Sequence, residues 1–125
     1  MSKNNHMATA EKYYLALARK DLTEMAQYLH PDVEFISPLA TLQGKQAYLQ
    51  AAKGFAEAII TITIRSLCGN DNQVMMAYDT LSPEPIGHFQ TASLITFEDG
   101  LMKRLEFFYD PRPLLKEKKD QIFDK

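Results

Sequence analysis

Apolar side chains in the first half of the chain recur at the spacing of helices. From Ala8 to Lys20 they fall three or four residues apart, which predicts a helix. The segment from Asp21 to Leu29 predicts a second helix, because Asp21 can cap its start and Glu24 follows three residues later. From Lys45 to about Ala58 one helix face is again apolar, which predicts a third helix.

The rest of the chain carries strand signals. A short strand is predicted at Val33–Ile36, between two prolines, and a loop follows it up to Gly44. Four longer segments rich in β-branched and aromatic residues alternate with turn residues in "GNDN", "SPEP" and "EDG". These four predicted strands are residues 59–67, 73–81, 87–97 and 101–110.

The lengths of two loops predict how the last three strands pair. If "EDG" is a three-residue loop, Phe97 faces Leu101, and if "SPEP" is a four-residue loop, Leu81 faces Ile86. A slip of one residue in either loop would exchange the two faces of the sheet. The first predicted face carries Val74, Met76, Tyr78, Thr80, Phe89, Thr91, Ser93, Leu105, Phe107 and Tyr109. The second carries Met75, Ala77, Asp79, His88, Gln90, Ala92, Arg104, Glu106, Phe108 and Asp110.

The two predicted faces differ in chemistry. The first is aromatic and hydroxyl-bearing without formal charge, so it should pack against the helices or line a pocket for an apolar ligand. The second mixes charged residues with apolar ones such as Met75, Ala92 and Phe108. A surface of that kind predicts a homodimer through the convex face of the sheet.

Length, composition and charge exclude several classes of protein. The 125 residues fit one domain, predicted at 8–112, with a disordered tail at 1–7 and a charged tail at 113–125 that could form a short helix. A net charge of −2 disfavours nucleic-acid binding. Cys68, the single cysteine, excludes an intramolecular disulfide and fits a cytoplasmic location. No apolar run reaches the roughly 20 residues of a membrane span, and the start does not read as a signal peptide.

Three stretches resemble a known family. "YYLALARKDLTEMAQYLHPDVEFISP", "LQGKQAYLQAAKGF" and "ITFEDGLMKRLEFFYDP" are similar to the SnoaL-like branch of the nuclear transport factor 2-like superfamily, which includes ketosteroid isomerase. The resemblance implies an α+β fold: a cone-shaped barrel in which a strongly curved, mostly antiparallel sheet wraps around three N-terminal helices. It also implies a pocket at the wide end of the cone and dimerisation through the sheet.

The resemblance does not carry the catalytic groups of two relatives. Ketosteroid isomerase needs a carboxylate base, a tyrosine donor and a protonated aspartate. Tyr13 matches the tyrosine, whereas Ser37 and Ser93 stand at the other two positions. Limonene epoxide hydrolase uses an Asp-Arg-Asp set, and the nearest cavity positions here are Met76, Tyr78 and Phe107. Function therefore does not follow from the fold alone.

Several residues are candidates for the site. The tyrosines could donate hydrogen bonds to a ligand, or could be core aromatics whose hydroxyls find internal partners. The predicted ligand-binding residues are Tyr13, Tyr14, Leu17, Phe35, Ser37, Phe55, Met76, Tyr78, Thr91, Ser93, Phe107 and Tyr109. Catalytic residues are unknown, with Tyr13, Asp79, His88 and Asp110 as weak candidates.

The predicted registers place His88 opposite both Asp79 and Asp110, a set that could shuttle protons. The same registers place the set on the convex face, which favours an ion pair at an interface or on the surface. The three histidines form no i, i+4 pair, so no metal site and no cofactor are predicted.

Three functions follow from these patterns. The first is a protein that binds a small apolar or weakly polar ligand in a largely uncharged, tyrosine-lined pocket. The second is a cofactor-independent isomerase, cyclase or hydrolase, and the third is a dimeric interaction module whose pocket is filled by its own side chains. An uncharged cavity favours the first, a cavity of at least ~300 Å³ with a buried titratable group the second, and a filled cone the third.

Overall fold

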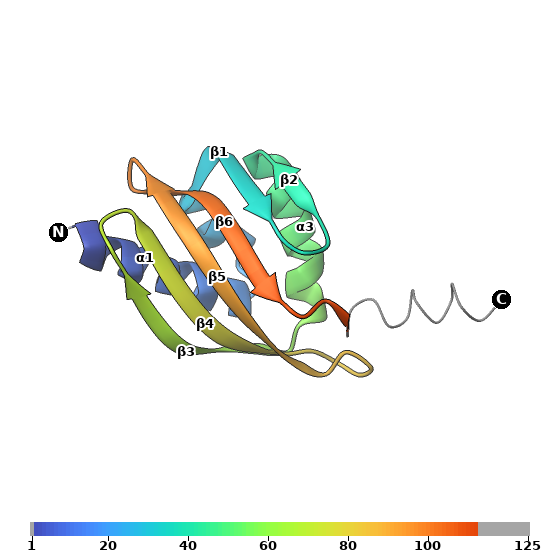
Figure 1. Ribbon diagram of the computed structural model, residues 1–125. Coiled ribbons are helices and arrows are strands. Elements are labelled where there is room, and N and C mark those ends of the chain that lie inside the picture. The colour runs from blue at the N-terminus through green and yellow to red at the C-terminus, as the bar shows by residue number, and fades with distance from the viewer. Residues whose placement is uncertain (1, 113–125) are drawn as a thin grey trace.

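A computed structural model describes residues 2–112 of the chain, which form three helices and six strands (Figure 1). The helices are α1 (Ser2–Ala18), α2 (Leu22–Gln27) and α3 (Lys45–Ala58). The strands are β1 (Leu29–Ile36), β2 (Thr41–Gln43), β3 (Thr61–Gly69), β4 (Gln73–Leu81), β5 (His88–Glu98) and β6 (Leu101–Tyr109).

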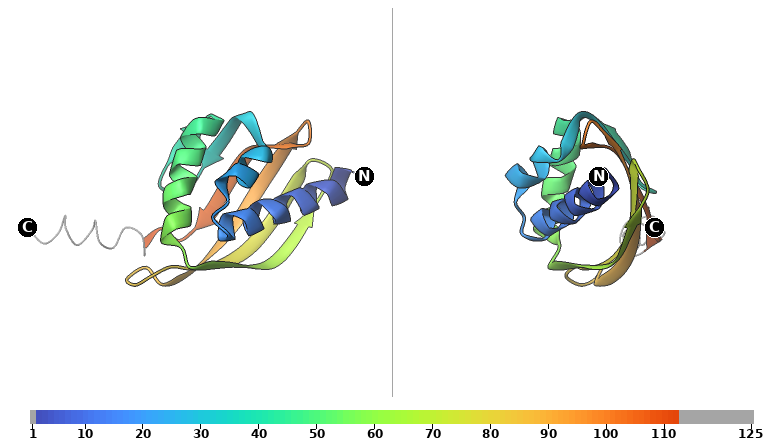
Figure 2. Two further views of the ribbon diagram at one scale, coloured as in Figure 1. Left: turned by 180° about the vertical axis from the view of Figure 1, so that it is seen from behind. Right: turned by 90° about the vertical axis from the view of Figure 1, so that its left-hand side faces the viewer.

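The six strands form one sheet in the order β2-β1-β6-β5-β4-β3, and every neighbouring pair is antiparallel except β1 and β6. The three helices lie on the concave side of this sheet (Figure 2). The predicted α+β fold with a curved sheet around three helices is therefore confirmed. The sheet does not close into a barrel, because β2 and β3 remain as edges.

Irregular pairing accompanies the curvature of the sheet. The register shifts once between β3 and β4, at Ile64/Ser66, and once between β5 and β6, at Thr96/Phe97. A bulge of this kind bends its strand and increases the local twist. The strands can therefore wrap around α1, which lies inside the curve when viewed along its axis (Figure 2).

The helices largely follow the sequence pattern. The Asp21 side chain caps α2 by accepting a hydrogen bond from the Glu24 N–H at 3.0 Å, as predicted. Helix α1 begins at Ser2, six residues before the predicted start, so the segment predicted as a disordered tail is helical in residues 2–7. The His6 ring stacks on the buried ring of Phe97, with centroids 4.2 Å apart, which gives this first part of α1 a tertiary contact.

The β1–β2 region differs from its prediction. Strand β1 begins at Leu29 instead of Val33, because Leu29 pairs with Met102 of β6 before the register shifts and pairing resumes at Glu34. Strand β2 falls within a segment predicted as a loop. Three residues are too few to show an alternating pattern, so the sequence alone gave no signal for this edge strand.

The predicted registers are wrong by two residues. Tyr78 lies opposite Thr91 instead of Phe89, and Thr91 lies opposite Tyr109 instead of Phe107. The first error arises because the β4–β5 loop spans residues 82–87 and not only the four of "SPEP". The second arises because Glu98 pairs with Leu101 around a two-residue turn and the register then shifts between Thr96 and Phe97.

Both register errors are even numbers, so the predicted sorting of the two faces is confirmed. Met76 on the concave face is 0% exposed, whereas its neighbour Met75 on the convex face is 40% exposed. The same alternation continues along β5 and β6, where Ser93 and Leu105 are buried and Phe108 is exposed. The hydrophobic core therefore lies between the concave face and the helices.

Candidate functional site

A cavity of about 220 Å³ lies on the concave side, between α3 and the strands β4, β5 and β6. Seven of its fifteen lining residues are aromatic, so rings make up much of its wall. The lining residues are Leu17, Phe35, Tyr48, Ala51, Ala52, Phe55, Ala58, Ile59, Tyr78, Ser82, Ile86, Phe89, Thr91, Phe107 and Tyr109.

Helix α3 supplies one wall of the cavity. Its lining residues include Tyr48, Ala52 and Phe55, which fall at steps of four and three along one helix face. Ala51 and Ala58 complete this wall. Because the three alanines have short side chains beside the cavity, Ala52 buried and Ala51 and Ala58 exposed at its border, they leave space that larger apolar residues would fill.

The sheet supplies the opposite wall, which is aromatic. Phe35 packs against Phe107 edge to face, with ring centroids 4.9 Å apart, and against Tyr48 at 5.2 Å. Further along, Phe89 and Tyr109 have ring centroids 6.2 Å apart. These contacts hold the rings in place without filling the space in front of α3.

The structure brings part of the predicted ligand-binding set together at this cavity. Seven of the predicted residues line it: Leu17, Phe35, Phe55, Tyr78, Thr91, Phe107 and Tyr109. The other five, Tyr13, Tyr14, Ser37, Met76 and Ser93, are not among its lining residues.

The predicted residues outside the cavity have other roles. Tyr13, Tyr14, Met76 and Ser93 are at most 1% exposed and belong to the packed core. The Ser37 hydroxyl accepts hydrogen bonds from the Leu39 and Ala40 N–H groups at 3.3 and 3.2 Å, and donates to the Ala40 carbonyl at 3.1 Å. Ser37 therefore holds the turn between β1 and β2.

Hydroxyl groups form a buried cluster next to the cavity. The Tyr13 and Tyr48 hydroxyls are hydrogen-bonded to each other, and the Tyr14 hydroxyl donates to the Ser93 hydroxyl at 3.2 Å. Burial raises the pKa of the Tyr14 phenol to about 12 and raises the pKa values of Tyr13, Tyr48 and Tyr78 as well. All four phenols therefore stay neutral at physiological pH and cannot act as bases there.

Eight residues of the lining were not predicted as ligand-binding from the sequence: Tyr48, Ala51, Ala52, Ala58, Ile59, Ser82, Ile86 and Phe89. A signal existed for the α3 residues, because Tyr48, Ala52 and Ile59 share the apolar helix face of Phe55. Phe89 was also sorted to the correct face of the sheet. Ser82 was missed because loop residues were not sorted to either face of the sheet, and Ile86 because the β4–β5 loop was assumed to end at residue 85.

The remaining catalytic candidates lie away from the cavity. His88 lies opposite Leu81, not opposite Asp79 and Asp110 as predicted, and its Nε2 reaches the Asp79 carboxylate diagonally at 3.6 Å on the convex face. Asp110 instead accepts hydrogen bonds from the Arg112 guanidinium at 2.6 to 2.9 Å. These hydrogen bonds lower the pKa of the Asp110 carboxyl to about 2. The predicted three-residue set is therefore not assembled.

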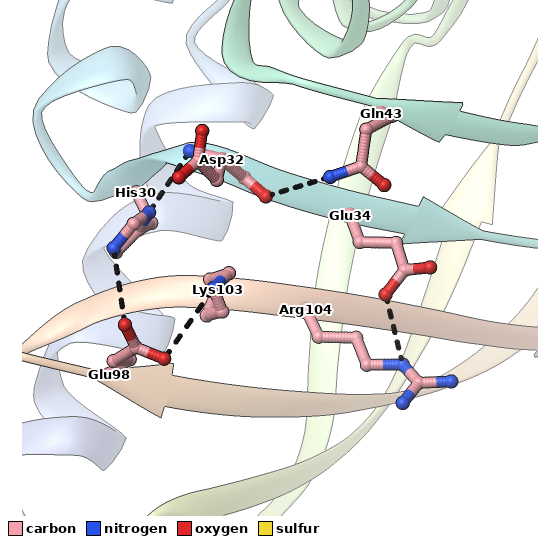
Figure 3. Close-up of polar contacts among 7 residues, drawn as sticks. All are labelled: His30, Asp32, Glu34, Gln43, Glu98, Lys103 and Arg104. Atoms are coloured by element: carbon pink, nitrogen blue, oxygen red, sulfur yellow. Dashed lines mark hydrogen bonds and ion pairs between the residues drawn. The ribbon is translucent and has the colours of Figure 1, made fainter.

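One cluster has the composition of a metal site: His30, Glu98 and Asp99 lie near the β5–β6 turn. The His30 Nδ1 accepts a hydrogen bond from the Asp32 N–H at 3.0 Å, so the neutral ring carries its proton on Nε2, which faces Glu98 at 3.6 Å (Figure 3). Glu98 also faces the Lys103 ammonium at 3.5 Å. Glu98 and Lys103 form an ion pair, and neither nitrogen of the neutral His30 ring is free for a metal, because Nδ1 accepts the Asp32 N–H and Nε2 carries the proton.

Fold and cavity together define an α+β protein with a pocket between a curved sheet and its helices. Residues 10–105 match the SnoaL-like domain, and the chain therefore belongs to the SnoaL-like family. No protein of curated function matches the chain in sequence. None of the helices within residues 2–112 is long and apolar enough to span a membrane.

Several solved structures share the fold at low sequence identity. A nuclear transport factor 2-like protein of unknown function from Cytophaga hutchinsonii is 18% identical over 88% of this chain and 94% of its own, with a TM-score of 0.78. An LEH-like epoxide hydrolase from M. tuberculosis is 12% identical over 100% of both chains, with a TM-score of 0.80. A de novo designed protein with a curved β-sheet is 17% identical over 99% and 98%, with a TM-score of 0.81. An enzyme and a designed protein share this architecture, so the likeness defines the fold alone.

Proposed function

We propose that the protein binds a small, uncharged, mostly apolar molecule in the cavity between α3 and the sheet. The observation that carries this proposal is the chemistry of the lining: none of the fifteen residues, all within the described part of the chain, is an Asp, Glu, His, Lys or Arg. A charged ligand would lose its hydration without gaining an ionic partner, which is costly. An uncharged ligand gains apolar contact area instead.

The same observation ranks the two alternative functions lower. An isomerase, cyclase or hydrolase working without a cofactor needs a group that accepts a proton near pH 7. The described lining offers only phenol and alcohol hydroxyls for that task, and the phenols Tyr48 and Tyr78 have raised pKa values. An interaction module with a filled pocket is disfavoured by the open space of about 220 Å³.

A paired substitution on α3 tests the proposal. Ala52 lines the cavity, whereas Ala47 on the same helix is exposed and outside it. Ala52→Leu should fill the space and weaken the binding of uncharged fragments at least about tenfold, which corresponds to ~1.4 kcal/mol, while Ala47→Leu should leave binding unchanged. Ligand-observed NMR with a library of uncharged aromatic and aliphatic fragments provides the measurement. Binding that is equal in both variants would contradict the proposal.

We further propose that two copies associate through the convex face. Phe108 and Met75 are 50% and 40% exposed there, among the paired charges of Asp79, His88 and Arg65. Covering such apolar side chains stabilises a symmetric dimer. Light scattering at micromolar concentration should give twice the mass of the chain, and Phe108→Asp should give the monomer mass. The cytoplasmic location and the absence of nucleic-acid and membrane partners remain predictions from the sequence.

A further inference from the structure

We infer that the part of the ligand held inside the cavity is a single six-membered aromatic ring carrying one small polar substituent. The inference rests on the proposed function, because it names the class of molecule that the uncharged cavity would take. Three observations lead to it: the volume of the cavity, the contrast between its two walls, and the state of its hydroxyl groups.

The volume limits the ligand to about one ring. A dry apolar cavity of about 150 Å³ holds benzene, whereas pockets for drug-sized ligands begin near 300 Å³. The space of about 220 Å³ lies between these values. It therefore exceeds the need of a bare ring by roughly two water volumes of ~30 Å³ each, enough for a small substituent. A four-ring skeleton would not fit inside without moving the lining side chains.

The walls favour a ring over a flexible chain. Ala51, Ala52 and Ala58 of α3 present short side chains on one side, and the rings of Phe89 and Phe107 stand on the sheet side. Aromatic pairs in edge-to-face or offset geometry gain stabilisation beyond that of the area that they bury. A planar ring lying against the alanine wall could meet several of these aromatic side chains at once. An alkyl chain would gain only the free energy that comes from burying its apolar surface.

The hydroxyl groups favour one polar substituent. The Tyr48 hydroxyl already shares a hydrogen bond with that of Tyr13, so part of its hydrogen-bonding capacity is used within the protein. The Ser82 hydroxyl makes no hydrogen bond with any residue in 2–112, although Ser82 is only 6% exposed and lines the cavity. Its oxygen is not among the fully buried atoms of the described residues that lack a partner, so it stays accessible, and a ligand group can hydrogen-bond to it in place of water. Tyr109 lines the cavity and also makes no side-chain hydrogen bond within the described residues.

Calorimetric titration with matched probes tests the inference. The probes are toluene, phenol, methylcyclohexane and naphthalene, which vary in polarity, aromaticity and size. Toluene and phenol should bind, methylcyclohexane should bind several-fold more weakly than toluene, and naphthalene should bind at least tenfold more weakly. Ser82→Ala should weaken phenol binding about two- to tenfold, the loss expected for one net hydrogen bond, and should change toluene binding by a smaller factor.

The outcomes separate this inference from the proposed function. If only naphthalene or methylcyclohexane binds, and Ala52→Leu abolishes that binding, the single-ring inference is overturned while the proposed function stands. If Ser82→Ala changes toluene and phenol binding equally, the polar-substituent part is overturned. If no uncharged probe binds in a way that depends on Ala52, both fall. Thermal unfolding of each variant confirms that it folds, and Tyr109→Phe provides a second hydroxyl deletion at the same cavity.

Discussion

The two ends of the concave face use similar residues for different purposes. Next to α1 the sheet is packed, and Tyr14, Met76 and Ile95 are each at most 1% exposed. Next to α3 the sheet carries aromatic rings again, but Phe89, Phe107 and Tyr109 stay partly exposed around a cavity of about 220 Å³. What differs is the facing helix: α1 buries Tyr13 and Tyr14 at the packed end, whereas α3 brings three alanines, beside Tyr48 and Phe55, to the hollow end. The comparison shows that the residues of the facing helix decide whether the concave face of the sheet is tightly packed or borders a cavity.

The largest expected effect on the packed end is alkaline unfolding. The pKa of Tyr14 is raised from 10.0 to about 12, and those of Tyr13, Tyr48 and Tyr78 are also raised by burial. Because the folded pKa lies above the unfolded one, the stability from these neutral phenols is complete below pH 10 and is lost as pH rises beyond it. Between its unfolded and its folded pKa, each buried tyrosine lowers the free energy of unfolding by about 1.4 kcal/mol per pH unit. Circular dichroism should therefore show unfolding shortly above pH 10.

Tyrosinate absorbance provides the control for that experiment. Ionisation of the four buried phenols should coincide with the loss of secondary structure. Their ionisation near pH 10 in a chain that is still folded would contradict the burial described here. Tyr14→Phe should make the pH dependence shallower, since one titrating group is removed.

The next effect compares two adjacent methionines on opposite faces of β4. Met76→Ala should lower the free energy of unfolding by about 2–5 kcal/mol, because Met76 is 0% exposed and the packed end would be left with a void. Met75→Ala should cost less than about 1 kcal/mol, because Met75 is 40% exposed. Urea denaturation of both variants measures the difference. Equal losses would show that the faces of β4 are assigned wrongly.

A smaller effect is expected at the boundary between the two ends, where Tyr13 and Tyr48 share a hydrogen bond. Tyr13→Phe leaves the Tyr48 hydroxyl buried without its partner, which should cost about 1–3 kcal/mol. The double variant Tyr13→Phe with Tyr48→Phe should cost less than the sum of the two single variants, because neither hydroxyl then lacks a partner. Strict additivity in urea denaturation would show that the hydroxyls do not interact.

The smallest effect is expected at the C-terminal end of α3, next to Ala58 of the cavity lining. The Lys20 ammonium donates a hydrogen bond to the Ile59 carbonyl at 2.8 Å and another to the Ala56 carbonyl, which caps the C-terminal end of α3. Lys20→Met should cost about 0.5–1.5 kcal/mol, the net value of a hydrogen bond, and thermal unfolding measures it. Lys53 of α3 is exposed and makes no side-chain hydrogen bond within the described residues, so Lys53→Met should have a smaller effect. Equal losses of stability in the two variants would contradict the capping role of Lys20.

Periodicity predicted most of the fold but few of its connections. It found α3 with its observed bounds and four long strands within two residues of their ends, because these segments bury one face over many residues. It missed the pairing of Tyr78 with Thr91, since a pattern within a strand does not contain the length of the following loop. The faces were still assigned correctly because each loop error shifted the pairing by two residues.

The candidate site was harder to predict than the core for a physical reason. Periodicity marks the residues that leave water, but it does not tell a side chain that fills space from one that borders an empty volume. Tyr13 and Phe107 carry the same signal, yet Tyr13 is fully buried in the core and Phe107 lines the cavity. Ala51 and Ala58 were not named because an alanine on a helix indicates helix propensity more than function.

The alanine wall of α3 has a consequence for how such a protein could change its ligand over evolutionary time. Exchanging Ala51 or Ala58 for Gly, Val or Ser takes a single nucleotide substitution, and both positions are solvent-exposed. Such a change would reshape the recess while the tyrosines of α1 keep their partners. Under the proposed function, the alanines of α3 would set ligand preference while the tyrosines of α1 stabilise the core, so the first group could change without the second.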